Sequence, residues 1–553
     1  MNVVGRIMST VCLVLMLGFV SDALAQVDRG ADPADDGHVT ITEAPRLVRE
    51  GIKFLGQSAK IRRFDLTLDD AIQRALDRNL DIVVERINPQ VLDLTLAQQE
   101  AFYRPTFGFN VNANSRITPS ATQLDGGDIT ETDTSNFDVS VNQPVRFGGG
   151  SLSVGFDNNR QETTNAFSSF NPGYRSAFVT QYTQPLLRGF RIDDSRSQIK
   201  VTQINRDISK IDLRQTITNT VADVENSYWE LLYSVGSVGV QQQALELAEQ
   251  LVRDNRARVE IGILAPIDVV QSQAEAASRR QTLAQAQQVL RTAELVIKRL
   301  IVSGTQDELW TSEINPVDQP RLNQPPIDIR SAVANALGQR TDLNRAQRQQ
   351  DINQLNVRTL RNNTLPALDL VGTFNLQGQG GNQLVRNFLG GEAGQVIPGG
   401  YLDAIEQIVD ARFPLWTIGL EMSVPIGTSS DEAALERARL QIRQTDAELR
   451  QLELTVATEV TNAALQVESI REWIAAAKAS RELAEQQLVA EESKFEVGMS
   501  TNFFVVQSQR DLATARDIEL RAILDYQKAL VEFDRLQETS LGPTGISIVG
   551  SGG

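Results

Sequence analysis

The sequence contains almost none of the residues that build reactive or metal-binding sites. Its 553 residues include one cysteine, Cys12, and one histidine, His38. Cys12 lies in the N-terminal apolar stretch, so the mature chain is expected to carry no thiol, which excludes disulfides, thiolate metal sites and cysteine nucleophiles. His38 lies in an acidic segment without partners for a catalytic triad or a metal site. We therefore expect no enzyme activity, no cofactor and no metal site.

Long apolar runs and basic stripes are missing as well. Beyond the N-terminal stretch no segment of about 18 apolar residues occurs, so the sequence offers no membrane-spanning helix. Neither a phosphate-binding loop nor a dinucleotide fingerprint is present. The net charge is -17 and the pI is about 4.8, and this acidity excludes nucleic acid as a partner because nothing would neutralise the phosphates. If this chain crosses a membrane, it must do so as strands.

The N-terminus has the layout of a secretory signal peptide. Arg6 supplies a positive start, residues 7–20 are apolar, and Ala23-Leu24-Ala25 offers a cleavage site before Gln26. The apolar run is too short to span a membrane. We expect residues 1–25 to form the signal peptide, 26–63 a flexible extension, and 539–553 a flexible tail.

Two halves of the chain carry the same landmarks in the same order, which indicates an internal duplication. The first structural repeat is expected over 64–302, with strands at about 106–184 and a helical tip near 262. A linker over 303–326 leads to the second repeat at 327–538, with strands at about 367–425 and a tip near 498. The matching landmarks are Ala71 to Asp81 with Ala332 to Asp342, Pro105 with Pro366, Gln184-Pro185 with Val424-Pro425, and Glu260-Ile261-Gly262 with Glu496-Val497-Gly498.

Each repeat is predicted to contain one very long polar helix, over about 187–259 and 430–495. A glycine turn reverses each of them into a second helix, over 266–302 and 502–536. Apolar residues recur every three or four positions in the first long helix, which is typical of a coiled-coil seam. A helix of about 73 residues is about 110 Å long and is stable only beside other such helices, so assembly is expected. The predicted seam is Ile217, Val221, Val224, Tyr228, Leu231, Val235, Val238, Leu245, Val252 and Val259.

Between the helices, apolar residues alternate with polar or small ones, which predicts strands of about eight to ten residues. That length spans a bilayer as a tilted strand. Of 31 aromatic residues, 13 lie between Phe102 and Phe190, which fits aromatic girdles at a membrane interface, although the core of a soluble sandwich would look similar. We favour the membrane because no partner sheet is available. Four to six strands cannot close a barrel alone, so several chains must contribute.

With this order of elements, the chain resembles the outer-membrane efflux protein family, the TolC-type channels. The resemblance covers nearly everything from Leu66 to Leu536. It rests on the duplicated order, on the Pro105 and Pro366 turns, on Gln184-Pro185-Leu186-Leu187-Arg188-Gly189, and on the tips Arg258-Val259-Glu260-Ile261-Gly262-Ile263-Leu264 and Lys494-Phe495-Glu496-Val497-Gly498-Met499-Ser500.

The resemblance implies a homotrimer whose strands form one outer-membrane barrel in contact with lipid and whose helices form a periplasmic tunnel. A periplasmic adaptor would dock on the glycine tips, although these glycines could simply end the helices. The residues in this role would be Ile261, Gly262, Ile263, Val497, Gly498 and Met499. Family members also close the tunnel with charged side chains near the tip. Asp268 is one candidate, although its counterpart is Phe504 and it could instead cap the hairpin. Glu275 and Asp511 are weaker candidates.

The first half is about 21 residues longer than the second between its proline landmarks. The excess contains Gln143-Pro144, an echo of Gln184-Pro185, and predicts an extra hairpin and six strands where the family usually has four. This hairpin either widens the barrel or folds over its outside.

The expected function is a passive exit duct of a tripartite efflux pump or a type I secretion system, opened by the adaptor and an inner-membrane transporter. The alternative is a non-conducting structural coiled coil of the periplasm or cell surface.

Overall fold

The computed structural model describes residues 63–119, 128–320, 327–386, 393–427 and 429–539. Residues 1–62 and 63–553 separate into two units. The predicted signal peptide, the extension up to residue 62, His38 and the tail beyond residue 539 lie outside the described residues.

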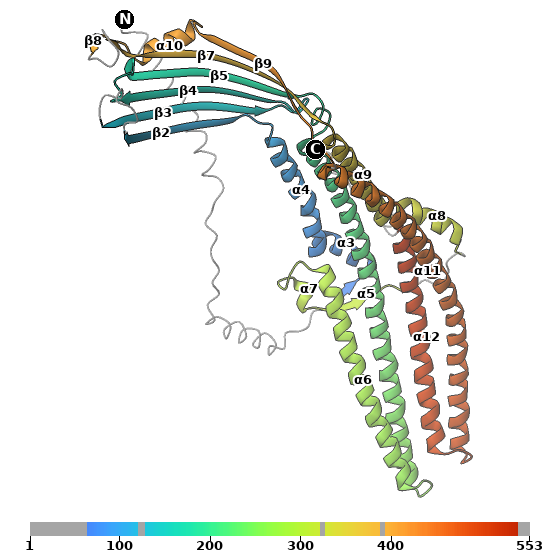
Figure 1. The fold of residues 1–553 in the computed structure, drawn as a ribbon. Coiled ribbons are helices and arrows are strands. Elements are labelled where there is room, and N and C mark those ends of the chain that lie inside the picture. Colours follow the sequence, from blue (N-terminus) through green and yellow to red (C-terminus); the bar gives the residue numbers. More distant parts are fainter. Residues whose placement is uncertain (1–62, 120–127, 321–326, 387–392, 428, 540–553) are drawn as a thin grey trace, which may run out of the picture. The chain divides into compact units, whose positions relative to one another are not determined.

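Helices of matching length follow one another in the two halves (Figure 1). The short helices α3 (Leu68–Arg78) and α8 (Ile329–Gln339) have 11 residues each. α4 (Leu80–Ala101) has 22 residues and α9 (Thr341–Asn363) has 23. The long helices α5 (Asp194–Glu260) and α11 (Ser430–Glu496) have 67 residues each, and their return helices α6 (Pro266–Ile301) and α12 (Asn502–Gln537) have 36 each.

Sequence signals at the helix ends explain these boundaries. The Thr67 hydroxyl accepts a hydrogen bond from the backbone N–H of Asp70 and begins α3, and Ser429 forms a capping box with Glu432 at the start of α11. The predicted start of α5 near residue 187 was wrong. The helix begins at Asp194, because the Asp193 carboxylate caps the N–H of Arg196 at 2.7 Å and Gly189, with a φ of +82°, turns the chain before it.

In the described part of the chain, seven strands form one antiparallel sheet. The strand order is β2 (Thr106–Pro119), β3 (Ile129–Pro144), β4 (Ser151–Thr163), β5 (Phe170–Pro185), β7 (Ala367–Arg386) and the short β8 (Ala393–Ile397). β9 (Pro414–Ser423) also pairs with β7, along the same edge as β8 but at the N-terminal end of β7. Six strands have 10 to 20 residues, longer than predicted in most cases, because hydrogen bonding continues past the apolar segments into polar ones. The extra hairpin of β3 and β4 lies within the sheet and not over its outside.

The two faces of the sheet differ in chemistry. One face carries a row of apolar side chains that stand directly opposite one another on neighbouring strands, namely Phe109, Val139, Phe156, Phe178, Leu376 and Pro414. The other face carries polar side chains in the same registers, including Asn110, Asp138, Asp157 and Gln377. This alternation is typical of a membrane barrel with a polar interior.

The predicted seam of α5 is buried in its first part and again at Leu245. Ile217, Val221, Val224, Tyr228 and Leu231 are buried, whereas Val235 is exposed and Val252 and Val259 are only partly buried. From Ser234 onward the buried stripe of α5 runs over Ala244, Leu245, Ala248, Leu251 and Asn255.

The predicted linker contains two short elements, α7 (Glu308–Thr311) and β6 (Glu313–Pro316). β6 pairs in parallel with β1 (Arg63–Leu66). The hydroxyl of the buried Tyr228 donates to the Asp318 carboxylate at 2.6 Å and accepts the N–H of Val317. Burial, together with Asp318, raises the pKa of Tyr228. This contact fixes the linker against the middle of α5.

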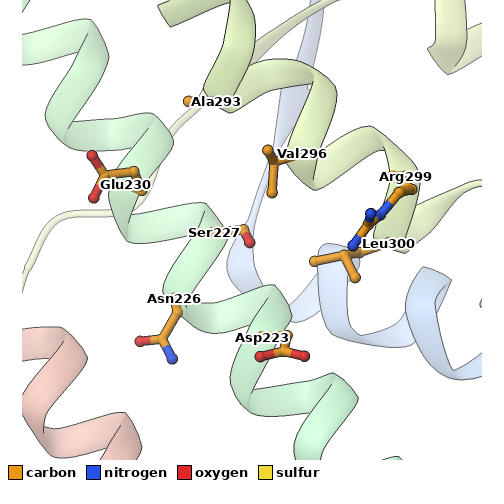
Figure 2. Close-up of a pocket in the computed structure, with 8 residues that line it drawn as sticks. All are labelled: Asp223, Asn226, Ser227, Glu230, Ala293, Val296, Arg299 and Leu300. Atoms are coloured by element: carbon orange, nitrogen blue, oxygen red, sulfur yellow. The ribbon is translucent and has the colours of Figure 1, made fainter. Parts of the chain in front are cut away.

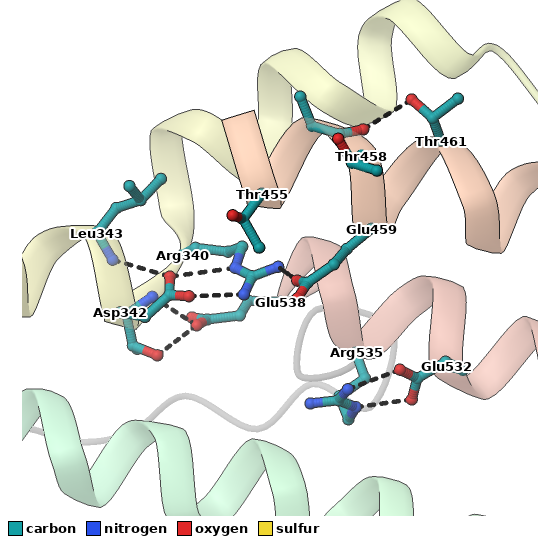
Figure 3. Close-up of polar contacts among 12 residues, drawn as sticks. Arg340, Asp342, Leu343, Thr455, Thr458, Glu459, Thr461, Glu532, Arg535 and Glu538 are labelled. Atoms are coloured by element: carbon teal, nitrogen blue, oxygen red, sulfur yellow. Dashed lines mark hydrogen bonds and ion pairs between the residues drawn. The ribbon is translucent and has the colours of Figure 1, made fainter. Parts of the chain in front are cut away.

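The junction of α8 and α9 is held by charged groups (Figure 3). Arg340 binds Asp342 and Glu459 at 2.6 Å each, and the backbone N–H of Thr341 donates to Glu538 at 2.6 Å. Residues of α9, α11 and the end of α12 are thereby joined in one place.

In the first half of the chain, a hollow lies between α5 and α6. The residues that line it include Asp223 and Arg299 (Figure 2).

Candidate docking tips and gate residues

Both helical hairpins reverse through the same backbone motif. The N–H of Ile263 donates to the carbonyl of Arg258 at 2.9 Å, and Met499 donates in the same way to Lys494 at 2.8 Å. Between them Gly262 and Gly498 have φ values of +79° and +77°. This pattern is a Schellman motif, in which a left-handed residue, normally glycine, ends a helix. The glycines are therefore required by the backbone, whatever else binds there.

The tips expose apolar side chains to solvent. Ile261, Ile263 and Val497 are 69–73% exposed and Met499 is 81% exposed. The two motifs satisfy their own backbone groups, so these side chains are not needed to form the turns. Exposed apolar groups clustered at the end of a hairpin are typical of a surface that binds another protein.

A buried polar network joins the two hairpins beneath the tips. Asn255 of α5, which is fully buried, donates to the Ser272 hydroxyl of α6 at 2.6 Å and to the side-chain oxygen of Asn502, at the start of α12, at 2.7 Å. Close by, the Arg258 guanidinium lies 4.6 Å from the centre of the Phe495 ring. These contacts join the first hairpin to the second hairpin, at least one helical turn away from the glycine turns.

Glu275 forms a second link between the hairpins. Its side chain is almost fully buried, and it accepts hydrogen bonds from Arg279 on its own helix at 2.7 Å and from the Nε of Arg510 on α12 at 3.0 Å. Burial by itself raises the pKa of Glu275, but the hydrogen bonds from Arg510 and Arg279 outweigh it and hold the pKa below its usual value of 4.5. Glu275 is therefore an ionised, buried contact between α6 and α12.

The other two candidate gate residues lie differently. Asp268 is in the first turn of α6, where a carboxylate favours the helix N-terminus, and its backbone carbonyl accepts from Ser272 and Asn502. Asp511, the counterpart of Glu275, is exposed and accepts a hydrogen bond from Gln507 of its own helix at 2.8 Å. Of the three acidic residues, Glu275 is the one whose carboxylate bonds the other hairpin.

The partners of these residues were not predicted from the sequence. Arg510 and Asn255 were absent from the candidates, because a contact between hairpins about 235 residues apart leaves no local pattern. A signal for Asn255 does exist: it lies seven residues after Ala248 on the buried stripe, where an asparagine must find a hydrogen-bond partner.

Two further findings concern the described ranges only. None of the helices there combines the length and the apolar character needed to cross a membrane. No group of three or more histidine, cysteine, aspartate or glutamate residues in this part of the chain is arranged to hold a metal ion.

Comparison with known proteins identifies the family. Residues 150–301 and 332–537 match the family model described as outer membrane efflux protein. No curated protein sequence matches the chain.

Solved outer-membrane channels have a similar fold at low sequence identity. The Campylobacter jejuni CmeC outer membrane channel is 13% identical with a TM-score of 0.62, covering 86% of both chains. The Vibrio cholerae outer membrane protein VceC is 13% identical with a TM-score of 0.60, covering 85% of this chain and 95% of its own. The open state of the Neisseria gonorrhoeae MtrE outer membrane channel is 14% identical with a TM-score of 0.56, covering 86% and 89%.

The family match spans more than half of the chain, and the channels of this family are passive conduits and not enzymes. The chain therefore belongs to the outer membrane efflux protein family, as a non-enzymatic channel of the outer membrane that extends into the periplasm.

Proposed function

We propose that the chain is one of three identical protomers of the exit duct of a tripartite efflux pump. The observation that carries this proposal is the open sheet. Among the described strands β2 pairs only with β3, and β9 pairs only with β7. The backbone N–H and C=O groups at the edge of a sheet in lipid have no water with which to form hydrogen bonds. Each edge strand therefore needs to pair with a strand from another chain. Three copies would place β9 of each beside β2 of the next and close one barrel.

An apolar stripe on α4 supports assembly at the level of the helices. Val84, Ile87, Val91 and Leu94 recur at spacings of three or four and are 49–73% exposed. A stripe of this kind on a helix is stable in water only against another helix. In the proposed trimer the partner helix comes from the neighbouring protomer.

The tips are the proposed docking surface for a periplasmic adaptor, and an inner-membrane transporter supplies the energy for export. The apolar side chains of Ile261, Ile263, Val497 and Met499 would contact the adaptor, while Gly262 and Gly498 shape the turns. The Glu275–Arg510 contact holds the hairpins together near the tip in the closed state, and Asp268 and Asp511 are weaker gate candidates.

We further infer an internal duplication, because the paired helices have equal lengths and equal tip motifs. The extra hairpin of β3 and β4 then gives each protomer six long strands. The outer membrane efflux description favours an efflux pump over a type I secretion system. The alternative of a non-conducting coiled coil leaves the two-faced sheet without a role.

Disulfide cross-linking between chains tests the open edges. The predicted mature chain has no cysteine, so Thr417→Cys in β9 can be combined with Asn110→Cys, Asn112→Cys or Asn114→Cys in β2, all on the polar face. We expect oxidation of at least one pair to give covalent dimers and trimers on a denaturing gel. Thr417→Cys with Ser153→Cys in the central strand β4 should give none. Monomers with every β2 partner would contradict the trimeric barrel.

A further inference from the structure

The short helix α10 (Tyr401–Val409) lies along β7, between the segments that pair with β8 and β9 (Figure 1). Its backbone contacts that strand closely. A Cβ atom on Gly378 would lie 1.9 Å from the carbonyl oxygen of Ala404, and one on Gly380 would lie 2.2 Å from that of Gly400. Gly378 and Gly380 are therefore strand residues whose missing side chains make room for a helix.

α10 covers the apolar face of the sheet. The row of directly opposed residues next to the all-apolar row consists of Val111, Phe137, Asn158, Ser176 and Gly378. Val111 and Phe137 are exposed, as lipid-facing side chains are, whereas Asn158 and Ser176 are buried. The Tyr401 hydroxyl donates to Asn158 at 2.9 Å, and the rings of Tyr401 and Tyr174 meet edge to face. The helix thus covers the part of the row where β4, β5 and β7 lack apolar side chains.

The helix also closes the free edge of β7. The N–H of Gln379 donates to the side chain of Gln407 at 3.0 Å, and the Gln407 amide donates back to the Gln379 carbonyl at 2.8 Å. The N–H of Gln377 donates to the carbonyl of Phe413. These bonds replace the strand that is missing between β8 and β9, so backbone groups at this depth stay satisfied.

The outer side of α10 is apolar. Ala404 and Ile408 are buried against the sheet, whereas Leu402 and Val409 are 73% and 77% exposed. Leu402, Ile405 and Val409 are three and four residues apart and share one side of the helix. The acidic residues Asp403, Glu406 and Asp410 lie on the remaining side, and Arg412 pairs with Glu406 and Asp410. An apolar side next to a charged side is typical of a helix that lies in a membrane interface; the charged side of such helices is usually basic, whereas that of α10 is acidic.

We propose that α10 is an interfacial membrane helix on the outside of the barrel, and that Leu402, Ile405 and Val409 contact lipid acyl chains. The stripe continues the apolar rows of the sheet, at the place where β4, β5 and β7 carry asparagine, serine and glycine. The helix replaces the missing apolar side chains, and its acidic side reaches the headgroups. This proposal rests on the proposed barrel, since it requires the apolar face of the sheet to contact lipid.

Fluorescence quenching tests the proposal on the full trimer in vesicles of phosphatidylethanolamine and phosphatidylglycerol. A bimane probe is attached at Leu402→Cys, Val409→Cys or Glu406→Cys, and at Val154→Cys on the apolar face of β4 as the control. Quenching is measured with brominated acyl chains and, separately, with aqueous iodide. We expect the probes at 402 and 409 to lose fluorescence to brominated lipid as strongly as the probe at 154, and the probe at 406 to be quenched mainly by iodide.

Two results would overturn the assignment while leaving the barrel intact. Iodide quenching at 402 and 409 would mean that the stripe faces water, and protection from both quenchers would mean that a neighbouring protomer covers it. In both cases the probe at 154 would still be quenched by brominated lipid. Loss of that control signal would instead contradict the lipid-facing sheet itself.

Discussion

Removing the negative charge of Glu275 should loosen the contact between the two hairpins near their tips. In Glu275→Gln the side chain keeps its shape, but the guanidinium groups of Arg279 and Arg510 then face a neutral amide with one accepting oxygen in place of the two carboxylate oxygens. Charge-assisted hydrogen bonds contribute about 1.5–3 kcal/mol, and loss of the negative charge on the acceptor weakens each contact by about 1 kcal/mol. The bond from Arg510 is discounted by about half because that side chain is 51% exposed. The total is about 1.5 kcal/mol, or about tenfold in an equilibrium constant.

The same contact predicts an acid dependence. The pKa of Glu275 is lower in the folded protein than its usual value of 4.5. Its contribution to stability is therefore fully present above pH 4.5 and is lost as the pH falls through the lower, folded-state pKa. Wild-type protein should approach the behaviour of Glu275→Gln in this acid range, and the variant should show less of this pH dependence.

The measurement is the open probability of single channels in a planar bilayer at neutral pH. We expect Glu275→Gln to raise the ratio of open to closed time by about tenfold, in line with the 1.5 kcal/mol above. Asp511→Asn is the matched comparison, since Asp511 occupies the equivalent position and accepts its hydrogen bond from Gln507 of its own helix, and it should change the ratio much less than Glu275→Gln does. An unchanged ratio in Glu275→Gln, or an equal rise in Asp511→Asn, would refute the role of the inter-hairpin contact.

Two further predictions concern stability, and a third concerns the packing of α10. Gly498→Ala should cost about 1–2 kcal/mol in thermal unfolding, because the residue has a φ of +77° with open space around it; Gly239→Ala, in the middle of α5 with equal space, should not destabilise. Burial, reinforced by Asp534 and Asp69, raises the pKa of Glu225 to about 7. Ionisation of Glu225 therefore lowers the stability of the folded protein as the pH rises from 4.5 to 7. Glu225→Gln should raise the melting temperature at pH 8 and leave it unchanged at pH 4. Gly378→Leu should displace α10 from β7 and thereby change the quenching of a probe at residue 402. Unchanged quenching would contradict the packing of α10 on β7.

Local signals explain which parts of the fold could be predicted. The ends of α11 and both tips were predicted to within about one residue because caps and glycines act within one helical turn. The Asp193 cap is equally local and would have corrected the start of α5. The strands were predicted too short, since the outer part of β3 contains Thr-Glu-Thr-Asp-Thr, which has no apolar alternation.

The parts that could not be predicted depend on contacts between distant segments. α10 has nine residues and lies among glycines, so it resembles a loop until the strand beneath it is known. Glu275 was selected for its charge and its place in the repeat, but its burial depends on Arg510 of the other hairpin. The docking role of the tips and the gate role of Asp268, Glu275 and Asp511 stay predictions.

The measurement that tests the central claim most directly is single-channel conductance of the detergent-purified protein, with its mass determined in parallel. The full chain has a mass of 60.9 kDa, so a trimer should have three times the mass of the chain without its leader. We predict a heat-resistant trimer that shows small, long-lived openings in a planar bilayer. A monomer or dimer that needs no detergent and conducts no current would contradict the trimeric duct.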